Sequence, residues 1–282
     1  MEKKIPVTYN IPFHLLSDEM RRCFLRELAL NGAKHVVLGQ SLLTMLIERP
    51  ELLQQIASEM EANALTFKDA HAPVNAHRDL GCAFAAERKG VLLRQKLALE
   101  TAAFFNVKTM TVHLGKRAPE LSEESFYDMI YSALDELLPF AEERKITLCI
   151  ENSYARKGFP GALFKIKEKF PVDTLGFCFD AGHANIVCDP ETKEKVQGID
   201  SKEILTAMLP HIVNCHIHDN DGSRDQHDLP GRGCADWPRI IAQLKKAPRL
   251  QVIQSEVAIP SNGVAVRELV ETFERLFQIN CT

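Results

Sequence analysis

The sequence predicts an α/β fold, a single (β/α)₈ barrel formed by residues 1–282. Short β-rich runs alternate with longer amphipathic runs along the whole chain, no Ser/Pro-rich linker separates them, and the length suits such a barrel, which needs ~250 residues. An open, doubly wound sheet is the competing fold, but it usually has fewer strands and a glycine-rich first turn. The first strand here is followed by Asn10-Ile-Pro-Phe, so the barrel is the better prediction.

Eight runs have the composition of strands and lie between helical stretches. In a barrel the side chains of each strand alternate between the lumen and the surrounding helices, so every second residue of a run shares one environment. The expected strands are residues 5–9, 35–39, 64–71, 108–113, 146–151, 175–180, 212–218 and 250–256.

Capping residues predict where several helices begin and end. Ser17 has the side chain of an N-cap, and the pair Asn31-Gly32 is typical of the residues that follow a last helical turn. A second helix is expected to start at Leu121-Ser-Glu-Glu and to run to Arg144. The last helix is expected to open at Gly263 and to end near residue 277.

The composition is that of a folded protein without a global attraction to polyanions. The formal net charge is −4, with 45% hydrophobic and 26% charged residues. This balance argues against nucleic acid as the partner but leaves room for a local basic patch. No apolar stretch approaches the ~18 residues of a membrane helix, and the first residues lack the apolar core of a secretory signal. We therefore expect a soluble, cytoplasmic protein with no membrane partner.

The eight cysteines are expected to be reduced thiols. The chain is long for a disulfide scaffold, and no secretory signal directs it to an oxidising compartment. No CxxC pair occurs in the sequence, so a zinc–thiolate site is not expected.

The third to the eighth predicted strands each end on or beside a side chain that can bind a metal ion. In parallel barrels the chemistry gathers at the C-terminal ends of the strands, so these side chains would meet at one mouth. If Asp180 faces the lumen, then Phe177 and Phe179 face the helices, which puts polar groups inside and bulky apolar groups outside. The strand-end residues are His71, His113, Glu151, Asp180, His216 and Glu256.

A divalent metal ion is the simplest explanation for so many converging carboxylates and imidazoles. A carboxylate buried at such a mouth is costly unless a cation or hydrogen-bond donors satisfy it. Oxygen ligands suit Mg²⁺ and Mn²⁺, whereas imidazoles favour Zn²⁺, Mn²⁺ or Co²⁺, and the set here is mixed. The sequence therefore predicts a divalent metal site, with Zn, Mn, Mg or Co as the candidate ions and with their number open.

Three segments carry a resemblance to a known family. They start at Phe179 (Phe-Asp-Ala-Gly-His-Ala-Asn), at His216 (His-Ile-His-Asp-Asn-Asp-Gly) and at Asp225 (Asp-Gln-His-Asp-Leu-Pro-Gly-Arg-Gly), and they resemble the xylose isomerase-like TIM-barrel superfamily. That group joins sugar phosphate isomerases and epimerases, inosose dehydratase-type enzymes and apurinic-site endonucleases of the endonuclease IV type. The strand-end residues match in order from His71 to Glu256, so the resemblance covers nearly the whole chain and leaves the activity open.

The resemblance to the epimerases implies a metal ion held by a quartet of strand-end residues, in which two glutamates also move a proton of the substrate. A metal ion polarises a carbonyl and the neighbouring hydroxyl, which acidifies the C–H bond between them, and one carboxylate on each face can remove or return that proton. Glu151, Glu256 and His183 would then be catalytic, His183 as a contact to a small sugar-like substrate. Homo-oligomerisation is common among such relatives and stays open here. The implied quartet is Glu151, Asp180, His216 and Glu256.

The resemblance to the endonucleases implies that more of the same residues bind zinc. One zinc ion would be held by His71, His113 and Glu151, and the quartet would hold a second. A third zinc ion would be held by His183, Asp225 and His227.

Three departures weaken the endonuclease hypothesis. The His-Pro-Gly turn usual in that family is His113-Leu-Gly here, and Val74 stands where that family has a tyrosine wedge. The segment Ala184-Asn-Ile-Val lacks that family's longer motif.

The sequence thus favours a divalent-metal-dependent isomerase or epimerase of a small sugar, sugar phosphate or related polyol carbonyl compound. The alternatives are a zinc-dependent phosphodiesterase acting at abasic sites in DNA and a metabolite-binding barrel without turnover. We expect His218 and Asp219 to support the site or to pack in the lumen. We expect Arg224 and Arg232, in the loop after the seventh strand, to be surface arginines rather than phosphate ligands.

Overall fold

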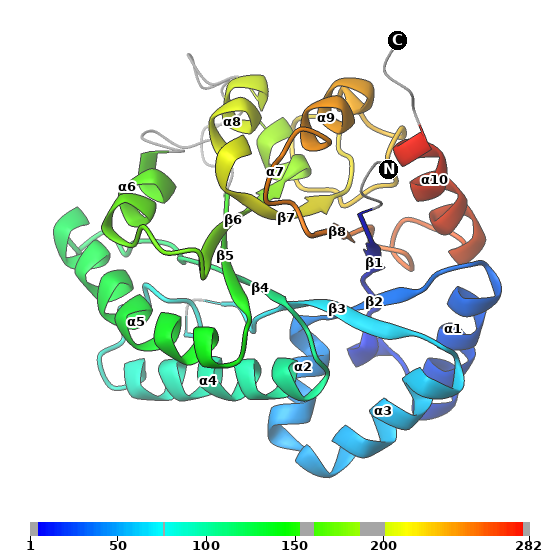
Figure 1. The fold of residues 1–282 in the computed structure, drawn as a ribbon, viewed down its shortest axis with the longest axis horizontal. Helices are drawn as coiled ribbons and strands as arrows, with labels where there is room; N and C mark the ends of the chain where they lie inside the picture. The colour runs from blue at the N-terminus through cyan, green and yellow to red at the C-terminus, as the bar shows by residue number, and fades with distance from the viewer. Residues whose placement is uncertain (1–4, 76, 153–160, 187–200, 279–282) are drawn as a thin grey trace.

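The computed structural model describes residues 5–75, 77–152, 161–186 and 201–278. Eight parallel strands form a closed barrel in the order β1 to β8, with β8 pairing back onto β1. The strands make a central ring and the helices surround it, as Figure 1 shows in a view along the barrel. The predicted (β/α)₈ barrel is therefore confirmed.

All eight predicted strands are present. The sixth has the predicted bounds, and the other seven are shorter by one or two residues at one end or both. The strands are β1 (Val7–Tyr9), β2 (His35–Leu38), β3 (Thr66–His71), β4 (Thr109–Val112), β5 (Thr147–Glu151), β6 (Leu175–Asp180), β7 (Ile212–Ile217) and β8 (Val252–Ser255).

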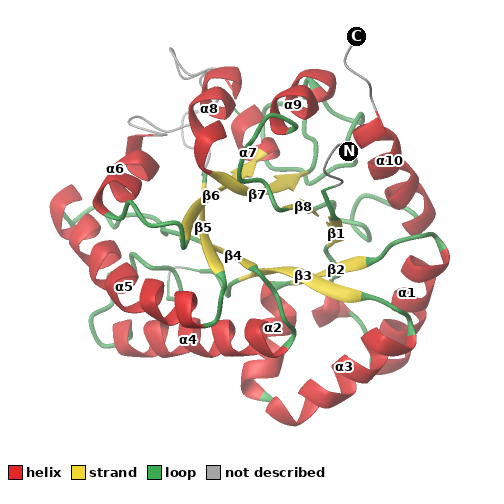
Figure 2. Ribbon diagram, viewed as in Figure 1, coloured by secondary structure: helices red, strands yellow, loops and turns green. Residues whose placement is uncertain are grey.

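The outer layer consists of helices joined to the strands by loops (Figure 2). The helices are α1 (Asp18–Leu30), α2 (Gln40–Glu48), α3 (Leu53–Ala62), α4 (Arg88–Phe104), α5 (Glu123–Glu143), α6 (Gly161–Lys169), α7 (Ala181–Asn185), α8 (Ser201–Met208), α9 (Trp237–Leu244) and α10 (Val266–Gln278), with short 3₁₀ turns at Phe13–Leu15, Pro50–Leu52 and Leu209–His211.

The predicted helix ends are confirmed for α1 and α5 and wrong for the start of α10. The Ser17 side chain accepts a hydrogen bond from the backbone N–H of Met20, and the Ser122 side chain caps α5 in the same way. Gly263 does not open the last helix. Its φ of 59° places it in a turn, and the helix begins three residues later at Val266.

The main hydrophobic core lies between the strands and the helices. Phe177 and Phe179 of β6 are buried in this layer, as their alternation with Asp180 predicts, and Phe164 of α6 meets the Phe177 ring edge-on at 5.4 Å. The lumen is different, because buried polar side chains such as Asp69, Thr111, Asn214 and Gln254 fill much of it. The barrel therefore presents a polar floor to whatever binds at its mouth.

Two further expectations concern the described part of the chain. None of the helices there combines the length and the apolar character that crossing a bilayer requires. The six described cysteines are free thiols, and four of them are buried. Cys188 and Cys281 lie outside the described residues.

Candidate metal centre

The predicted site residues converge at the C-terminal mouth of the barrel. Asp180 shows how the local fold places them, because it both ends β6 and caps α7, its Oδ1 accepting a hydrogen bond from the backbone N–H of His183 at 2.7 Å. The nine predicted residues form one connected network of contacts, and they are His71, His113, Glu151, Asp180, His183, His216, Asp225, His227 and Glu256.

The imidazole of His216 marks the centre of the site. Its Nδ1 lies 3.3 Å from Glu151 Oε1, 3.3 Å from Glu256 Oε1 and 3.6 Å from Asp180 Oδ2. His216 is fully buried, and this nitrogen has no hydrogen-bond partner. Ligands that bind a metal ion tetrahedrally at about 2.1 Å lie about 3.4 Å from one another. The three carboxylates of the quartet that the epimerase resemblance implies therefore each lie near this ligand-to-ligand distance from His216 Nδ1.

The charges of the site support the same conclusion. Burial opposes ionisation of Glu151, yet the neighbouring His113 and His216 hold its pKa well below the usual value. Burial likewise opposes ionisation of Asp180, whose pKa His183 and His218 lower. The His216 pKa is raised well above its usual value by surrounding acidic groups, against the effect of burial. Protons thus balance the carboxylates when no cation does, and a bound metal ion would compete with them.

A second set of ligand-type atoms lies on the far oxygen of Glu151. His113 Nε2 is 2.6 Å from Glu151 Oε2, and His71 Nε2 is 3.8 Å from the same oxygen. The Nδ1 of His71 lies 2.9 Å from the Ala72 carbonyl oxygen, to which it donates, so that Nε2 keeps its lone pair. The three ligand atoms of His71, His113 and Glu151 lie within 4.8 Å of one another.

A third set lies in the loop between β7 and α9. Asp225 Oδ2 is 3.0 Å from His227 Nε2 and 3.4 Å from His183 Nε2. Burial opposes protonation of His227, but the hydrogen bond to Asp225 raises its pKa to about 9. His227 has a φ of 49°, a left-handed backbone conformation that is uncommon outside glycine. Such strain persists where the surrounding structure holds a residue in place, which is frequent at functional sites.

His218 is a further candidate ligand, although the sequence predicted for it only a supporting or lumen-packing position. As expected for a supporting residue, its Nε2 lies 3.1 Å from Asp180 Oδ1. It also belongs to two ligand-type groups, one with Asp180 and Glu256 and one with Asp225 and His227. The alternation of side chains in β7 was the available signal, because it puts His218 on the same face as His216.

Asp219 does not pack in the lumen but organises the loop that carries Asp225 and His227. Its carboxylate accepts hydrogen bonds from Trp237 Nε1 at 2.7 Å and from the backbone N–H of Gly231 at 2.8 Å. Trp237 is buried in the hydrophobic core. Arg232, in the same loop, lies 2.8 Å from Glu268 Oε1 and is partly exposed, in line with its expected place at the surface. The pKa of the exposed Asp221 carboxyl is lowered by hydrogen bonds from Ser223 and also by the charge of Arg224.

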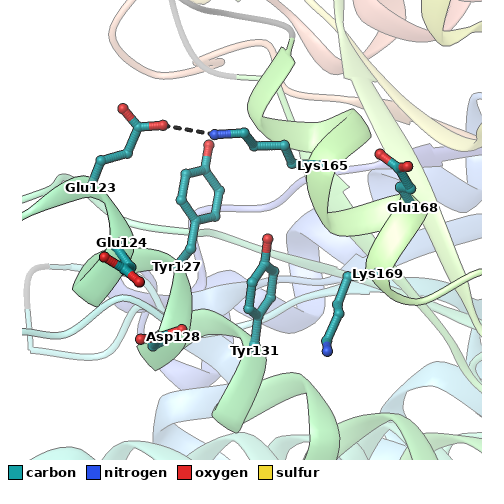
Figure 3. Close-up of a pocket in the computed structure, with 8 residues that line it drawn as sticks. All are labelled: Glu123, Glu124, Tyr127, Asp128, Tyr131, Lys165, Glu168 and Lys169. Carbon is teal, nitrogen blue, oxygen red and sulfur yellow. Dashed lines mark hydrogen bonds and ion pairs between the residues drawn. The ribbon is translucent and has the colours of Figure 1, made fainter.

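A hollow of about 630 Å³ lies away from the site, between α5 and α6 (Figure 3). Its lysines are paired within its own walls, since Lys165 Nζ lies 2.9 Å from Glu123 Oε1 and 4.8 Å from the centre of the Tyr127 ring. Lys169 lies over the Tyr131 ring at 5.9 Å. Among the described residues, the groups of histidines and carboxylates that could bind a metal ion lie at the barrel mouth and not in this hollow.

Comparison with solved structures gives barrels of the same fold. A D-tagatose 3-epimerase-like protein has 21% identity and a TM-score of 0.75, with 96% of each chain covered. The 3-keto-D-glucoside 4-epimerase YcjR of E. coli has 14% identity and a TM-score of 0.74, over 98% of this chain and all of the other. The IolI protein, solved with a bound zinc atom, has 17% identity and a TM-score of 0.71 over 96% of each chain. At these identities the likeness establishes the fold.

Sequence comparison identifies the family. The chain is 29% identical to the uncharacterized protein MJ1311 of Methanocaldococcus jannaschii over 213 residues, which are 72% of this chain and 68% of that protein. The family model described as the xylose isomerase-like TIM barrel matches residues 27–272. That match includes every residue of the network at the barrel mouth, and the chain belongs to the xylose isomerase-like TIM barrel family.

Proposed function

We propose that this protein is a divalent-metal-dependent isomerase or epimerase of a small sugar, sugar phosphate or related polyol carbonyl compound. The observation that carries the proposal is the approach of two glutamates to one histidine nitrogen. Glu151 comes from β5 and Glu256 follows β8, and each places a carboxylate oxygen 3.3 Å from His216 Nδ1. The solved epimerases of the same fold support the reaction class, and the zinc in IolI supports the choice of a metal site.

The quartet Glu151, Asp180, His216 and Glu256 would hold the ion. When bound there, a divalent cation would polarise a carbonyl and an adjacent hydroxyl of the substrate. The two glutamates reach the centre from different sides of the barrel wall, so one can take the proton from the substrate carbon while the other returns it on the opposite face. His183, whose Nδ1 lies 3.2 Å from Glu151 Oε1, would contact a substrate hydroxyl.

Solvent hydrogen exchange tests this proposal. The protein, loaded in turn with Mn²⁺, Co²⁺, Mg²⁺ and Zn²⁺, would be incubated with a panel of ketoses, ketose phosphates and inososes in D₂O, and NMR would detect deuterium at the carbon next to the carbonyl. We expect exchange with at least one substrate and a loss of 10²- to 10⁴-fold in Glu151→Gln and in Glu256→Gln. Glu271→Gln on the exposed face of α10 is the matched control. A panel in which no substrate exchanges would refute the proposal for those compounds.

The same variants address the metabolite-binding alternative. If the barrel only binds a metabolite, the wild-type protein would bind one of these compounds in a calorimetric titration without exchanging its hydrogen. Binding retained by Glu151→Gln together with loss of exchange would argue for turnover, because the glutamate would then act on the reaction and not on binding.

A zinc phosphodiesterase is the second candidate, and the two additional ligand groups favour it. His71 and His113 meet Glu151 on one side, and Asp225 with its histidines forms a group on the other, so the site has donors for more than one ion. Elemental analysis after purification without chelator or added metal distinguishes the two functions. Close to three zinc ions per chain, followed by nicking of abasic DNA, would support the phosphodiesterase. About one exchangeable divalent ion per chain would support the isomerase.

A further inference from the structure

A chain of buried polar side chains runs from His216 down into the lumen of the barrel. His216 Nε2, on the opposite side of the ring from the quartet, lies 3.3 Å from Thr111 Oγ1 of β4. Asn214 Nδ2 of β7 lies 3.2 Å from the same hydroxyl oxygen and 3.2 Å from Asp69 Oδ2 of β3. Thr111, Asn214 and Asp69 are all fully buried, so water does not compete for these contacts.

The Asn214 amide group fixes the direction of its own two hydrogen bonds. The Asn214 amide nitrogen has two hydrogens, and a carboxylate oxygen of Asp69 can only accept one of them when Asp69 is ionised. The second hydrogen is donated to Thr111 Oγ1, which is thereby an acceptor. The Thr111 hydroxyl keeps its own hydrogen and a lone pair, so it can either donate to His216 Nε2 or accept from it. When a metal ion binds His216 Nδ1, the ring hydrogen must be on Nε2, and Thr111 Oγ1 then lies in place to accept it.

Three other histidines of the site use the opposite arrangement. His71, His183 and His227 each direct Nδ1 at a backbone carbonyl oxygen, at 2.9, 2.9 and 2.8 Å. A carbonyl oxygen only accepts, so it fixes the tautomer by itself and leaves Nε2 for a ligand. His216 presents Nδ1 to the site instead, and its partner is a hydroxyl, which can donate as well as accept. The hydrogen bond from Asn214 fixes the position of Thr111 Oγ1, which can then accept the Nε2 hydrogen of His216 when a metal ion takes Nδ1.

We propose that Thr111, oriented by Asn214 and Asp69, is a positioning residue that accepts the Nε2 hydrogen of His216 and so supports the tautomer whose Nδ1 binds the metal ion. The inference rests on the proposed metal centre and adds to it a residue that supports one of the ligands from outside. Outer partners of metal-binding histidines typically change metal affinity by 10- to 100-fold when they are removed. The role is one of affinity and orientation, since Thr111 does not itself face the centre of the quartet.

The same strand offers a matched control. Thr109 lies two residues before Thr111 on β4, is equally buried, and its hydroxyl has no hydrogen-bond partner. Thr109→Val therefore makes the same chemical change in the same strand without touching His216. Thr111→Val removes the acceptor at nearly constant volume, and Thr111→Ser removes a methyl group but keeps the hydroxyl.

The experiment measures Zn²⁺ and Co²⁺ affinity by competition with a chromophoric chelator, after circular dichroism has shown that each variant is folded. We expect Thr111→Val to bind 10- to 100-fold more weakly than the wild type, and Thr109→Val and Thr111→Ser to stay within threefold of it. Equal affinities in wild type, Thr111→Val and Thr109→Val would overturn the proposal. A wild-type protein that binds no metal ion would instead refute the metal centre, which is a different result.

A second measurement keeps the inference testable if Thr111→Val does not fold. In zinc-loaded wild-type protein with ¹⁵N-labelled histidine, long-range ¹H–¹⁵N correlation reports which ring nitrogen carries hydrogen. We expect His216, assigned with the His216→Gln variant, to carry it on Nε2 and to bind through Nδ1. A hydrogen on Nδ1 would overturn the proposal whatever the variants show.

Discussion

The Asp180 carboxylate makes three contacts, which serve two tasks. Its Oδ1 caps α7 through the backbone N–H of His183 and also lies 3.1 Å from His218 Nε2, while its Oδ2 faces His216. The last residue of β6 thus sets the direction of a helix and supplies a charge to the site. Because a cap needs only an oxygen and a metal ion needs the charge, substitution can separate the two tasks.

Asp180→Asn is expected to keep the fold and to lose the metal ion. Asparagine is as good an N-cap as aspartate, so the melting temperature without metal changes by only a few degrees. Metal affinity falls at least 100-fold, because a charged ligand of the quartet is replaced by a neutral amide. Chelator competition and thermal melts measure the two effects. Asp180→Ala is the comparison, and it loses about 1 kcal/mol of capping as well. An Asp180→Asn protein with wild-type affinity would exclude Asp180 as a ligand.

Asp79, in the loop after β3, makes stability depend on pH. Burial raises its pKa from 3.8 to about 6. The native protein therefore binds this proton more tightly than the unfolded chain, and the associated stability is present below pH 4 and lost as the pH rises through 6. Asp79→Asn is expected to be more stable than the wild type by about 2 kcal/mol above pH 6, and the difference should vanish near pH 4. Urea unfolding with chelator present measures it, and a difference that does not vary with pH would contradict this account.

At the scale of elements, the sequence predicted each strand but placed several of its ends beyond the observed ones. His113, His218 and Glu256 were expected to end β4, β7 and β8, and each lies one residue past the strand. These residues lie at the barrel rim, where the strand pairing ends, and their side chains point toward the mouth. Alternation along a run shows which face a residue takes, but not where the hydrogen-bonded ladder stops.

Helix caps were the most accurate local predictions, because a cap depends on a few neighbouring residues. Ser122 Oγ accepts a hydrogen bond from the backbone N–H of Ser125 at 3.0 Å at the start of α5. Ser122→Ala should therefore lower the free energy of unfolding by about 1 kcal/mol, as measured in urea. Ser132→Ala, at an exposed position within the same helix, should have no destabilising effect, because alanine is the better helix former there. Equal losses in the two variants would show that the cap contributes nothing.

At the scale of the molecule, the convergence of the four quartet side chains could be predicted and the arrangement of the outer groups could not. The quartet follows from strand ends that a closed barrel must bring together. Asp225 and His227 reach the site because Asp219 binds Trp237 and Gly231, contacts that span up to 18 residues of chain. His227 also has a backbone conformation that its residue type does not suggest. No local pattern encodes such contacts, so only the resemblance indicated that this loop turns inward.

Metal removal is expected to lower the stability of the whole barrel, because the quartet joins β5, β6, β7 and the residue after β8. A ligand that binds only the native state adds about 2.7 kcal/mol when its free concentration is 100 times Kd. Thermal melts with Zn²⁺ or Mn²⁺, and again with chelator, measure the effect. It should shrink as the pH falls, since protons then compete with the metal ion for the histidines. Asp180→Asn is the control and should melt at the same temperature in both conditions.

The pairing of β1 with β8 joins Val7 to Ile253, two residues at opposite ends of the sequence. A nascent chain leaves the ribosome from its N-terminus, so β1 emerges long before the strand that completes the ring. Until then the growing sheet has two open edges, which invite pairing with other chains. Glu256, the final member of the quartet, emerges just after β8. In the proposed metal centre the full set of ligands is therefore present only after all eight strands have been synthesised, which would make metal loading a late step in the maturation of this barrel.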